Sequence, residues 1–254
     1  MNFLQQTQYM SYYVLNLTEG FKPVDWEGAL VPVKEIEFKT FKFNGGELHF
    51  EITNPEIFDY EAVDLMITLK AKSFEDLGKL ALAVDAIERQ VLVKTKRLFI
   101  PYFPAGRQDR VTGYEALTLK VYADFINSMN FDSVLSIDNH SDVTTALVNN
   151  SESIDNFDVV STALEHMELT KPFALIAPDA GASKKVYKVA KKLHEEYDVD
   201  FKVVQGLKHR DTKTGELSGF QVVADDLEGM SCVIVDDICD GGGTFLGLAR
   251  ELKD

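Results

Sequence analysis

Residues 233–244 constrain the fold of this chain more than any other stretch. They read Val-Ile-Val-Asp-Asp-Ile-Cys-Asp-Gly-Gly-Gly-Thr. Three β-branched residues indicate a buried strand, two acids follow it, three glycines indicate a loop, and Thr244 opens a pattern of helical spacing. A glycine loop between a strand and a helix offers backbone N–H groups and the positive end of the helix to an anion. The segment therefore predicts a phosphate-binding loop in an α/β fold.

The two acids in this segment fit a ligand that carries hydroxyls beside its phosphate. Asp236 and Asp237 would accept hydrogen bonds from the hydroxyls of a sugar. A calcium loop or a solvated acidic turn is the plainer alternative, although calcium loops space their acids differently. With a strand before it and a helix after it, the segment resembles the ribose-phosphate signature of the type I phosphoribosyltransferase fold. This signature leaves the reaction open.

Apolar runs alternate with amphipathic helical patterns along the rest of the chain. Up to residue 52 the runs are short and broken by Gly and Pro, which indicates strands and hairpins. Later, the spacing of Leu77, Leu80, Ala81, Val84 and Ile87 predicts one helix. Another helix is predicted after Gly181, with an apolar face and a lysine-rich face that we expect to be solvated; its apolar residues are Val186, Val189, Ala190, Leu193 and Tyr197. The expected strands are 12–15, 29–33, 48–52, 63–69, 98–103, 134–137, 174–177, 201–204 and 232–235.

This alternation predicts an α/β protein with mostly parallel sheets flanked by helices. A chain of 254 residues with 45% apolar content can form one large domain or two modest ones, and we favour two. The polar cluster at 149–153 is the most loop-like segment near the middle. We therefore place an amino-terminal domain at 1–150 and a carboxyl-terminal domain at 151–254.

Composition excludes several classes of function. The net charge of −15 argues against a nucleic-acid partner, so any polyanionic substrate needs metal ions and a few well-placed cations. Cys232 and Cys239 are the two cysteines, which makes a disulfide framework or a zinc site unfavourable, and we expect both to be reduced and packed. No leader pattern or bilayer-length apolar run is present, so we expect a cytoplasmic protein without a membrane partner.

Polar residues follow an apolar run in five segments, where open α/β sheets bind their ligands. The first four read Phe-Asn-Gly-Gly-Glu at 43–47, Arg-Gln-Asp at 107–109, Asp-Asn-His at 138–140 and Pro-Asp-Ala-Gly at 178–181, and the fifth is the glycine loop. In this order they resemble the ribose-phosphate pyrophosphokinase family, from about Phe41 to the end of the chain. The resemblance implies two phosphoribosyltransferase-like domains in tandem. It also implies Mg²⁺-dependent transfer of the β,γ-diphosphoryl group of ATP to the anomeric hydroxyl of ribose 5-phosphate, with release of AMP.

The resemblance assigns roles on the ATP side. It implies that Phe43 and Glu47 hold the adenine and that Arg107, Gln108 and Asp109 surround the nucleotide. His140 and Asp179 match the magnesium site of the family, and an imidazole with a carboxylate leaves room for phosphate oxygens and water around the ion. No Gly-x-x-x-x-Gly-Lys-Ser/Thr segment is present, so ATP needs another scaffold.

The resemblance also assigns roles on the sugar side and in catalysis. Lys208 and Arg210 match a catalytic loop, where cations would meet the charge on the transferred group. The polar stretch 208–219 is accordingly expected to be a loop. Asp236 and Asp237 would bind ribose hydroxyls. The residues that would surround the ribose phosphate are Asp240, Gly241, Gly242, Gly243 and Thr244.

The chain also departs from the family pattern. It stops at Asp254, earlier than typical members, so it is a short variant or lacks a tail. Gly241 stands where the family usually has Thr, which raises the hypothesis that the acceptor is an esterified ribose 5-phosphate such as ADP-ribose. A base phosphoribosyltransferase and a non-catalytic regulatory paralogue stay as alternatives. We assign no role to His49, His166 or His194, and from the family we expect a homo-oligomer, a dimer or larger.

Overall fold

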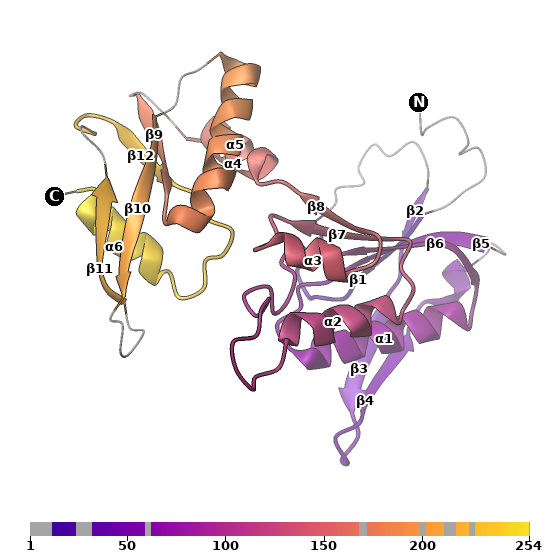
Figure 1. The fold of residues 1–254 in the computed structure, drawn as a ribbon. Coiled ribbons are helices and arrows are strands. Elements are labelled where there is room, and N and C mark those ends of the chain that lie inside the picture. The colour runs from indigo at the N-terminus through magenta and orange to yellow at the C-terminus, as the bar shows by residue number, and fades with distance from the viewer. Residues whose placement is uncertain are drawn as a thin grey trace. The chain divides into compact units, whose positions relative to one another are not determined.

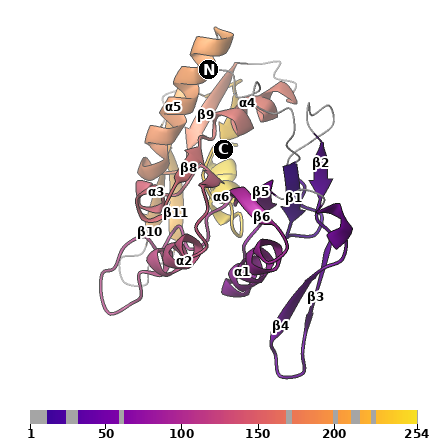
Figure 2. The same ribbon diagram turned by 90° about the vertical axis from the view of Figure 1, so that its right-hand side faces the viewer.

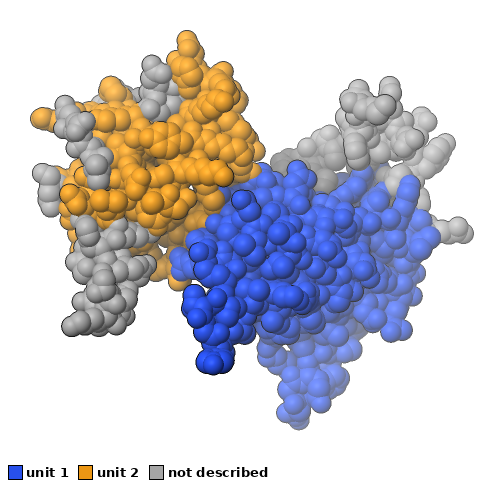
Figure 3. Space-filling view, in the orientation of Figure 1, with its two compact units in different colours: residues 1–154 blue, residues 155–254 orange. Residues whose placement is uncertain are grey.

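The computed structural model describes residues 12–23, 32–58, 62–167, 172–198, 202–210, 217–223 and 227–253. Its contacts divide the chain into two compact units, Met1–Ile154 and Asp155–Asp254, which Figure 3 shows in different colours. Each unit is described by itself below. The division falls four residues after the boundary that the polar cluster suggests.

Unit 1 is built on a six-stranded parallel sheet, in the order β2-β1-β5-β6-β7-β8 (Figure 1). Its strands are β1 (Tyr12–Asn16), β2 (Val33–Glu35), β5 (Ala62–Thr68), β6 (Leu92–Phe99), β7 (Ser133–Ile137) and β8 (Ser151–Ile154). The helices are α1 (Phe74–Glu88), α2 (Thr118–Asn127), α3 (Asp142–Leu147) and a 3-10 helix, η2 (Pro55–Ile57). A separate antiparallel hairpin, β3 (Phe38–Lys42) with β4 (Leu48–Ile52), projects from this unit.

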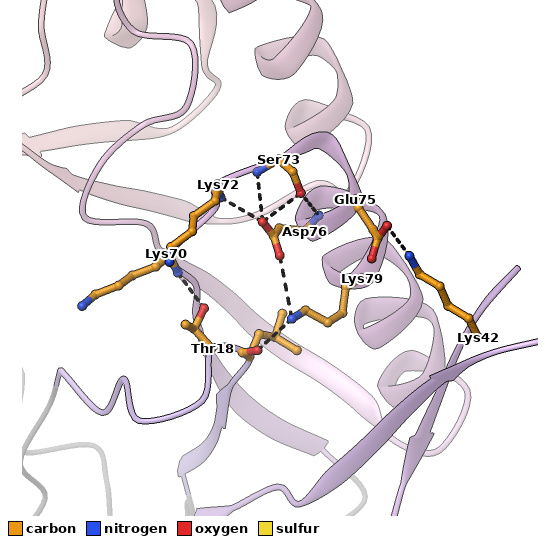
Figure 4. A network of polar contacts seen from close by, with 9 residues as sticks. Thr18, Lys42, Lys70, Lys72, Ser73, Glu75, Asp76 and Lys79 are labelled. Atoms are coloured by element: carbon orange, nitrogen blue, oxygen red, sulfur yellow. Dashed lines mark hydrogen bonds and ion pairs between the residues drawn. The ribbon is translucent and has the colours of Figure 1, made fainter. Parts of the chain in front are cut away.

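Helix α1 shows how the sequence determines a local structure. Ser73 caps its amino terminus and accepts a hydrogen bond from the backbone N–H of Asp76, whose carboxylate accepts one from Ser73 N–H in return (Figure 4). Lys79 Nζ lies 3.1 Å from the carbonyl oxygen of Leu17, which ties the first turns of the helix to the end of β1. The predicted apolar stripe is confirmed, because Leu77, Leu80 and Ile87 are fully buried and Val84 is only 4% exposed. Each such side chain contributes roughly 1.5–3 kcal/mol by leaving water.

Unit 2 has a four-stranded sheet in the order β11-β10-β9-β12, in which β9 pairs in parallel with β10 and β12 while β10 and β11 are antiparallel. The strands are β9 (Phe173–Ala177), β10 (Lys202–Arg210), β11 (Leu217–Val223) and β12 (Ser231–Ile234), and the helices are α4 (Phe157–Glu165), α5 (Ala180–Tyr197) and α6 (Gly243–Glu251). Leu175 and Ala177 of β9 pack with the apolar face of α5, whereas Ala174 and Ile176 contribute to a second cluster. The sheet is therefore buried on both faces of its central strand, as parallel strands require.

The expected α/β class with mostly parallel sheets is confirmed, but several local expectations are wrong. The polar segment expected to be a loop contains β8, which pairs with β7, because a backbone ladder at a sheet edge does not need apolar side chains. The strand expected at 98–103 begins at Leu92 instead. Tyr197, expected on the buried face of α5, is 42% exposed. Cys232 is half-buried, whereas Cys239, expected to be packed, is exposed.

Within the part of the chain that the structure describes, no helix combines the length and the apolar character needed to cross a bilayer.

Candidate functional site

The glycine loop of unit 2 follows β12 as predicted. Val235 continues the pairing with β9 through a hydrogen bond from its N–H to the carbonyl of Ile176, 3.0 Å long, and the chain then leaves the sheet. Gly242 lies at the amino-terminal cap of α6 with a φ of +73°, a left-handed conformation that favours glycine. A Cβ placed on Gly241, Gly242 or Gly243 would meet nothing within 4 Å. The loop thus exposes backbone to open space at the positive end of a helix.

The acid pair at the end of β12 is fixed by two contacts. Asp236 Oδ1 accepts a hydrogen bond from the N–H of Asp237 at 3.0 Å. Asp237 Oδ2 lies 3.1 Å from the ammonium of Lys185 on α5. Lys185 is an exception to the expected solvated lysine-rich face of α5, on which Lys188 is 63% and Lys191 is 76% exposed. Residues 185 and 237 are 52 positions apart, so no local sequence pattern predicts their contact.

Asp179 lies at the end of the neighbouring strand. It caps α5, and its Oδ1 accepts a hydrogen bond from the N–H of Ala182 at 3.0 Å. Because β9 and β12 are parallel and Ile176 pairs with Ile234, their carboxyl ends meet at the same edge of the sheet. The structure therefore brings Asp179 to the edge that carries the acid pair.

Strand β10 passes close to this edge at Gly206, which sequence analysis did not single out. A Cβ at this position would lie 2.9 Å from Leu248 Cδ2, 3.1 Å from the carbonyl oxygen of Pro178 and 3.3 Å from that of Ala177. Only glycine allows β10 to lie this close both to the end of β9 and to α6. A single glycine within the strand pattern, between Gln205 and Leu207, was the available signal.

Lys208 and Arg210 lie in β10 and not in a loop, which corrects the expectation for this segment. β10 continues beyond its last pair with β9, between Gln205 and Ala177, and from there pairs with β11. The ladder shifts register between His209 and Arg210. Antiparallel backbone pairing explains why the strand continues through residues 208–210, which have no apolar side chain. The side chains of 208–210 and all of 211–216 lie outside the described residues.

In unit 1, two loops run side by side beyond β6 and β7. Ile137 donates its N–H to the carbonyl of Pro101 at 2.9 Å, which joins the starts of the two loops. Gly106 follows in the first loop, and a Cβ added to it would lie 3.5 Å from His140 Cβ in the second. Arg107 and Gln108 are exposed. The structure therefore brings the Arg-Gln-Asp segment and His140 together at the carboxyl edge of this sheet.

Asp109 occupies a different environment from its exposed neighbours. Its side chain is only 2% exposed, and it accepts two hydrogen bonds from the guanidinium of Arg110, at 2.8 and 3.2 Å. The Arg110 bonds lower the pKa of this carboxyl to about 2, against the opposing effect of burial, with further help from Ser141 and His140. The carboxylate therefore stays charged and connects the two loops.

The predicted adenine residues lie on the β3–β4 hairpin. Phe43 is 53% exposed and its ring contacts those of Phe41 and His49, with centroids 5.0 and 5.8 Å away. Glu47 is exposed across a turn in which Gly46 has a φ of +95°. The tip of this hairpin and the loop after β6 lie at separate places on unit 1 (Figures 1 and 2). Unit 1 by itself therefore does not bring Phe43 and Glu47 to Arg107.

The two residues predicted to bind metal belong to different units, His140 to unit 1 and Asp179 to unit 2. Their pairing therefore stays a prediction. Among the described residues, no group of three or more His, Cys, Asp or Glu side chains is arranged to hold an ion. Mg²⁺ needs fewer protein ligands than that, since it commonly keeps several waters and uses one or two carboxylates with substrate phosphates. The hard oxygen donors at the edge of unit 2 suit that mode of binding.

Comparisons with known proteins agree with this fold. Residues 151–254 match the family model of the phosphoribosyl transferase domain. A ribose-phosphate pyrophosphokinase of Vibrio parahaemolyticus is 30% identical over 84% of this chain and 65% of its own length, and one of Marinomonas sp. is 29% identical over the same shares. The chain thus matches slightly less than two thirds of these relatives. The crystal structure of phosphoribosylpyrophosphate synthetase from Mycobacterium smegmatis shares the fold, with a TM-score of 0.72 at 18% identity, over 96% of this chain and 76% of that one. By sequence, the chain is similar to the ribose-phosphate pyrophosphokinases over most of its length, and its residues 151–254 are similar to the phosphoribosyl transferase domain.

Proposed function

We propose that this chain transfers the β,γ-diphosphoryl group of ATP to the anomeric hydroxyl of ribose 5-phosphate. In this reaction the anomeric oxygen forms a bond to the β-phosphorus, and the bond from that phosphorus to the α,β-bridging oxygen breaks. AMP leaves with the bridging oxygen, and the hydroxyl proton passes to solvent. The observation that carries the proposal is the edge of unit 2, where Asp179, the acid pair and the glycine loop lie together.

The sugar would bind at this edge. Asp236 and Asp237 would accept hydrogen bonds from its hydroxyls, and their fixed positions support selection among sugars. The backbone of Gly241, Gly242 and Gly243 would surround the phosphate beside the amino terminus of α6, with Asp240 and Thr244 on either side.

The nucleotide would bind to residues of unit 1. Arg107 and Gln108 are exposed at the edge of its sheet, and Phe43 offers an exposed aromatic ring that suits a base. The buried carboxylate of Asp109 is better suited to hold this loop in place than to touch the nucleotide. We therefore assign Asp109 a positioning role in place of direct contact.

His140 and Asp179 would hold Mg²⁺, with phosphate oxygens and water completing its coordination. When bound, the ion supplies neutralisation of the charge on the triphosphate. Lys208 and Arg210 would stabilise the charge that develops on the diphosphoryl group, because β10 carries them beyond the end of β9. The family relationship also supports a homo-oligomer.

A second acceptor is favoured by one observation. Gly241 has no side chain and open space around its Cβ position, so the phosphate end of the sugar site has room for a substituent. A ribose 5-phosphate that is esterified, as in ADP-ribose, would use that room.

One screen separates these possibilities. The full chain is incubated with Mg-ATP and either ribose 5-phosphate or ADP-ribose, and products are identified by mass. We expect AMP together with a diphosphorylated ribose 5-phosphate. A diphosphorylated ADP-ribose in its place would establish the second acceptor. No AMP with either acceptor would refute diphosphoryl transfer, and it would favour a base phosphoribosyltransferase or a non-catalytic paralogue.

A further inference from the structure

We propose that Lys185 is a positioning residue for the sugar site: its ammonium holds the Asp237 carboxylate in the orientation that selects a ribose with both its 2-hydroxyl and its 3-hydroxyl. This inference rests on the proposed function and names a determinant of its sugar specificity. Lys185 belongs to none of the five segments that carry the family resemblance.

The contact joins two elements that each form part of the site. Lys185 lies in the second turn of α5, whose amino-terminal cap is Asp179, and its Nζ is 3.1 Å from Asp237 Oδ2. The pair therefore ties the start of α5 to the loop after β12. A shift of either element would move the carboxylate relative to the glycine loop.

Burial gives this ion pair its importance. The Asp237 side chain is 10% exposed, whereas that of Lys185 is 32% exposed. A carboxylate so far removed from water is stabilised by a nearby positive charge, and removing one partner of such a pair is destabilising. Without the ammonium, we expect Asp237 to turn toward water or toward another cation.

The position of one carboxylate affects its neighbour as well. Asp236 Oδ1 accepts its hydrogen bond from the N–H of Asp237, so the two acids share a backbone segment. A carboxylate can accept several hydrogen bonds, so one that is already held by a lysine can still accept from a hydroxyl. The fixed pair is thus suited to two neighbouring hydroxyls at a defined spacing, and it favours ribose over a sugar that lacks one of them.

The other lysines of α5 provide a comparison. Lys188 is 63% exposed and contacts Asp155. Lys191 is 76% exposed and pairs with Glu195 one turn along the same helix. Exposed pairs of this kind contribute little. Lys191 is therefore a matched control for loss of a lysine from α5.

The test measures binding of ribose 5-phosphate and 2-deoxyribose 5-phosphate to the full chain by calorimetry, without ATP. We expect Lys185→Met to weaken ribose 5-phosphate binding about tenfold and to reduce the preference for ribose by a similar factor. Lys185→Arg should restore much of that preference, and Lys191→Met should behave as the unaltered chain. In turnover assays, Lys185→Met should raise KM for the sugar phosphate more than it lowers kcat.

A double variant tests whether Lys185 acts through its partner. If it does, adding Lys185→Met to Asp237→Asn should produce no further loss of preference for ribose. Equal weakening for both sugars, or a preference unchanged from that of Lys191→Met, would overturn the inference while the proposed function stands. Failure of the unaltered chain to bind either sugar phosphate would overturn the proposed function itself. Thermal melting of each variant identifies a general loss of folding, which would lower both affinities together and count against a positioning role.

Discussion

Replacing Gly206 by alanine tests the close approach of β10 to the end of β9 and to α6. The added methyl would lie 2.9 Å from Leu248 Cδ2 and 3.1 and 3.3 Å from two backbone carbonyl oxygens. The carbonyl oxygens belong to Ala177 and Pro178 at the end of β9, so they cannot move without disturbing the sheet. Leu248 is fully buried and has little space in which to turn. Overpacking of this kind costs about 1–3 kcal/mol.

The assay is urea and thermal unfolding of the full chain, followed through the transition of unit 2. For a domain of about 100 residues, each 1 kcal/mol corresponds to a fall in Tm of roughly 4–8 °C. Gly241→Ala is the matched control, because its methyl would meet nothing within 4 Å, and we expect it to change stability by less than about 0.5 kcal/mol. Leu248→Ala made in addition should relieve part of the Gly206→Ala penalty, giving a favourable coupling in a double-mutant cycle. A Gly206→Ala chain as stable as the control would refute the close approach.

Three further predictions follow from the site. Asp109→Asn should lower the free energy of unfolding by up to about 2 kcal/mol. Salt should reduce this effect, because Arg110 is exposed. The folded pKa of Asp109 is about 2, below its usual 3.8, so this contribution is present above about pH 4 and disappears as the pH falls toward 2. The stability difference between the unaltered chain and the variant should shrink over that interval in acid-unfolding curves, and a constant difference would count against the pair. Lys208→Ala should leave ATP binding nearly unchanged in calorimetry while kcat falls at least about a hundredfold, since its contact belongs to the transition state, and equal losses in binding and turnover would contradict that role. Gly241→Thr should weaken ADP-ribose more than ribose 5-phosphate in the acceptor screen if the open space admits an ester, and equal effects would remove the reason for the second acceptor.

The elements that sequence patterns predict well are those with a strong local signal. The apolar stripe of α1 and the strand–acid–glycine–helix order of residues 233–244 both depend on neighbours within a few turns of chain. The expected strand at 63–69 likewise matches β5, because a short and mostly apolar run is typical of a strand buried on both faces.

The features that sequence patterns do not predict depend on contacts between distant segments. β8 has the polar sequence Ser-Glu-Ser-Ile, and its strand conformation comes from pairing with β7. Lys185 meets an acid 52 residues away, and Gly206 is required by atoms of β9 and α6 that approach it only in the folded chain. Sequence periodicity carries no information about such partners, so these parts of the site become visible only in three dimensions.

The acidic composition of this chain is compatible with the proposed polyanionic substrate because positive charge is supplied locally. Asp179, Asp236 and Asp237 all follow the carboxyl ends of neighbouring strands in unit 2, in a chain whose net charge is −15. Two unit charges 4 Å apart interact by about 4 kcal/mol at the effective dielectric of a partly buried site, so such acids cannot remain close without counter-charges. Lys185 provides a permanent one for Asp237, and the amino terminus of α6 provides partial positive charge at the glycine loop. The remaining negative charge at this edge is suited to a divalent cation, which the triphosphate itself would bring to the site.

On this reasoning, Lys185→Met should tighten binding of Mn²⁺ to the full chain, measured by electron paramagnetic resonance, because it removes a competing cation. Unchanged or weaker Mn²⁺ binding would show that the lysine does not share the field of these acids.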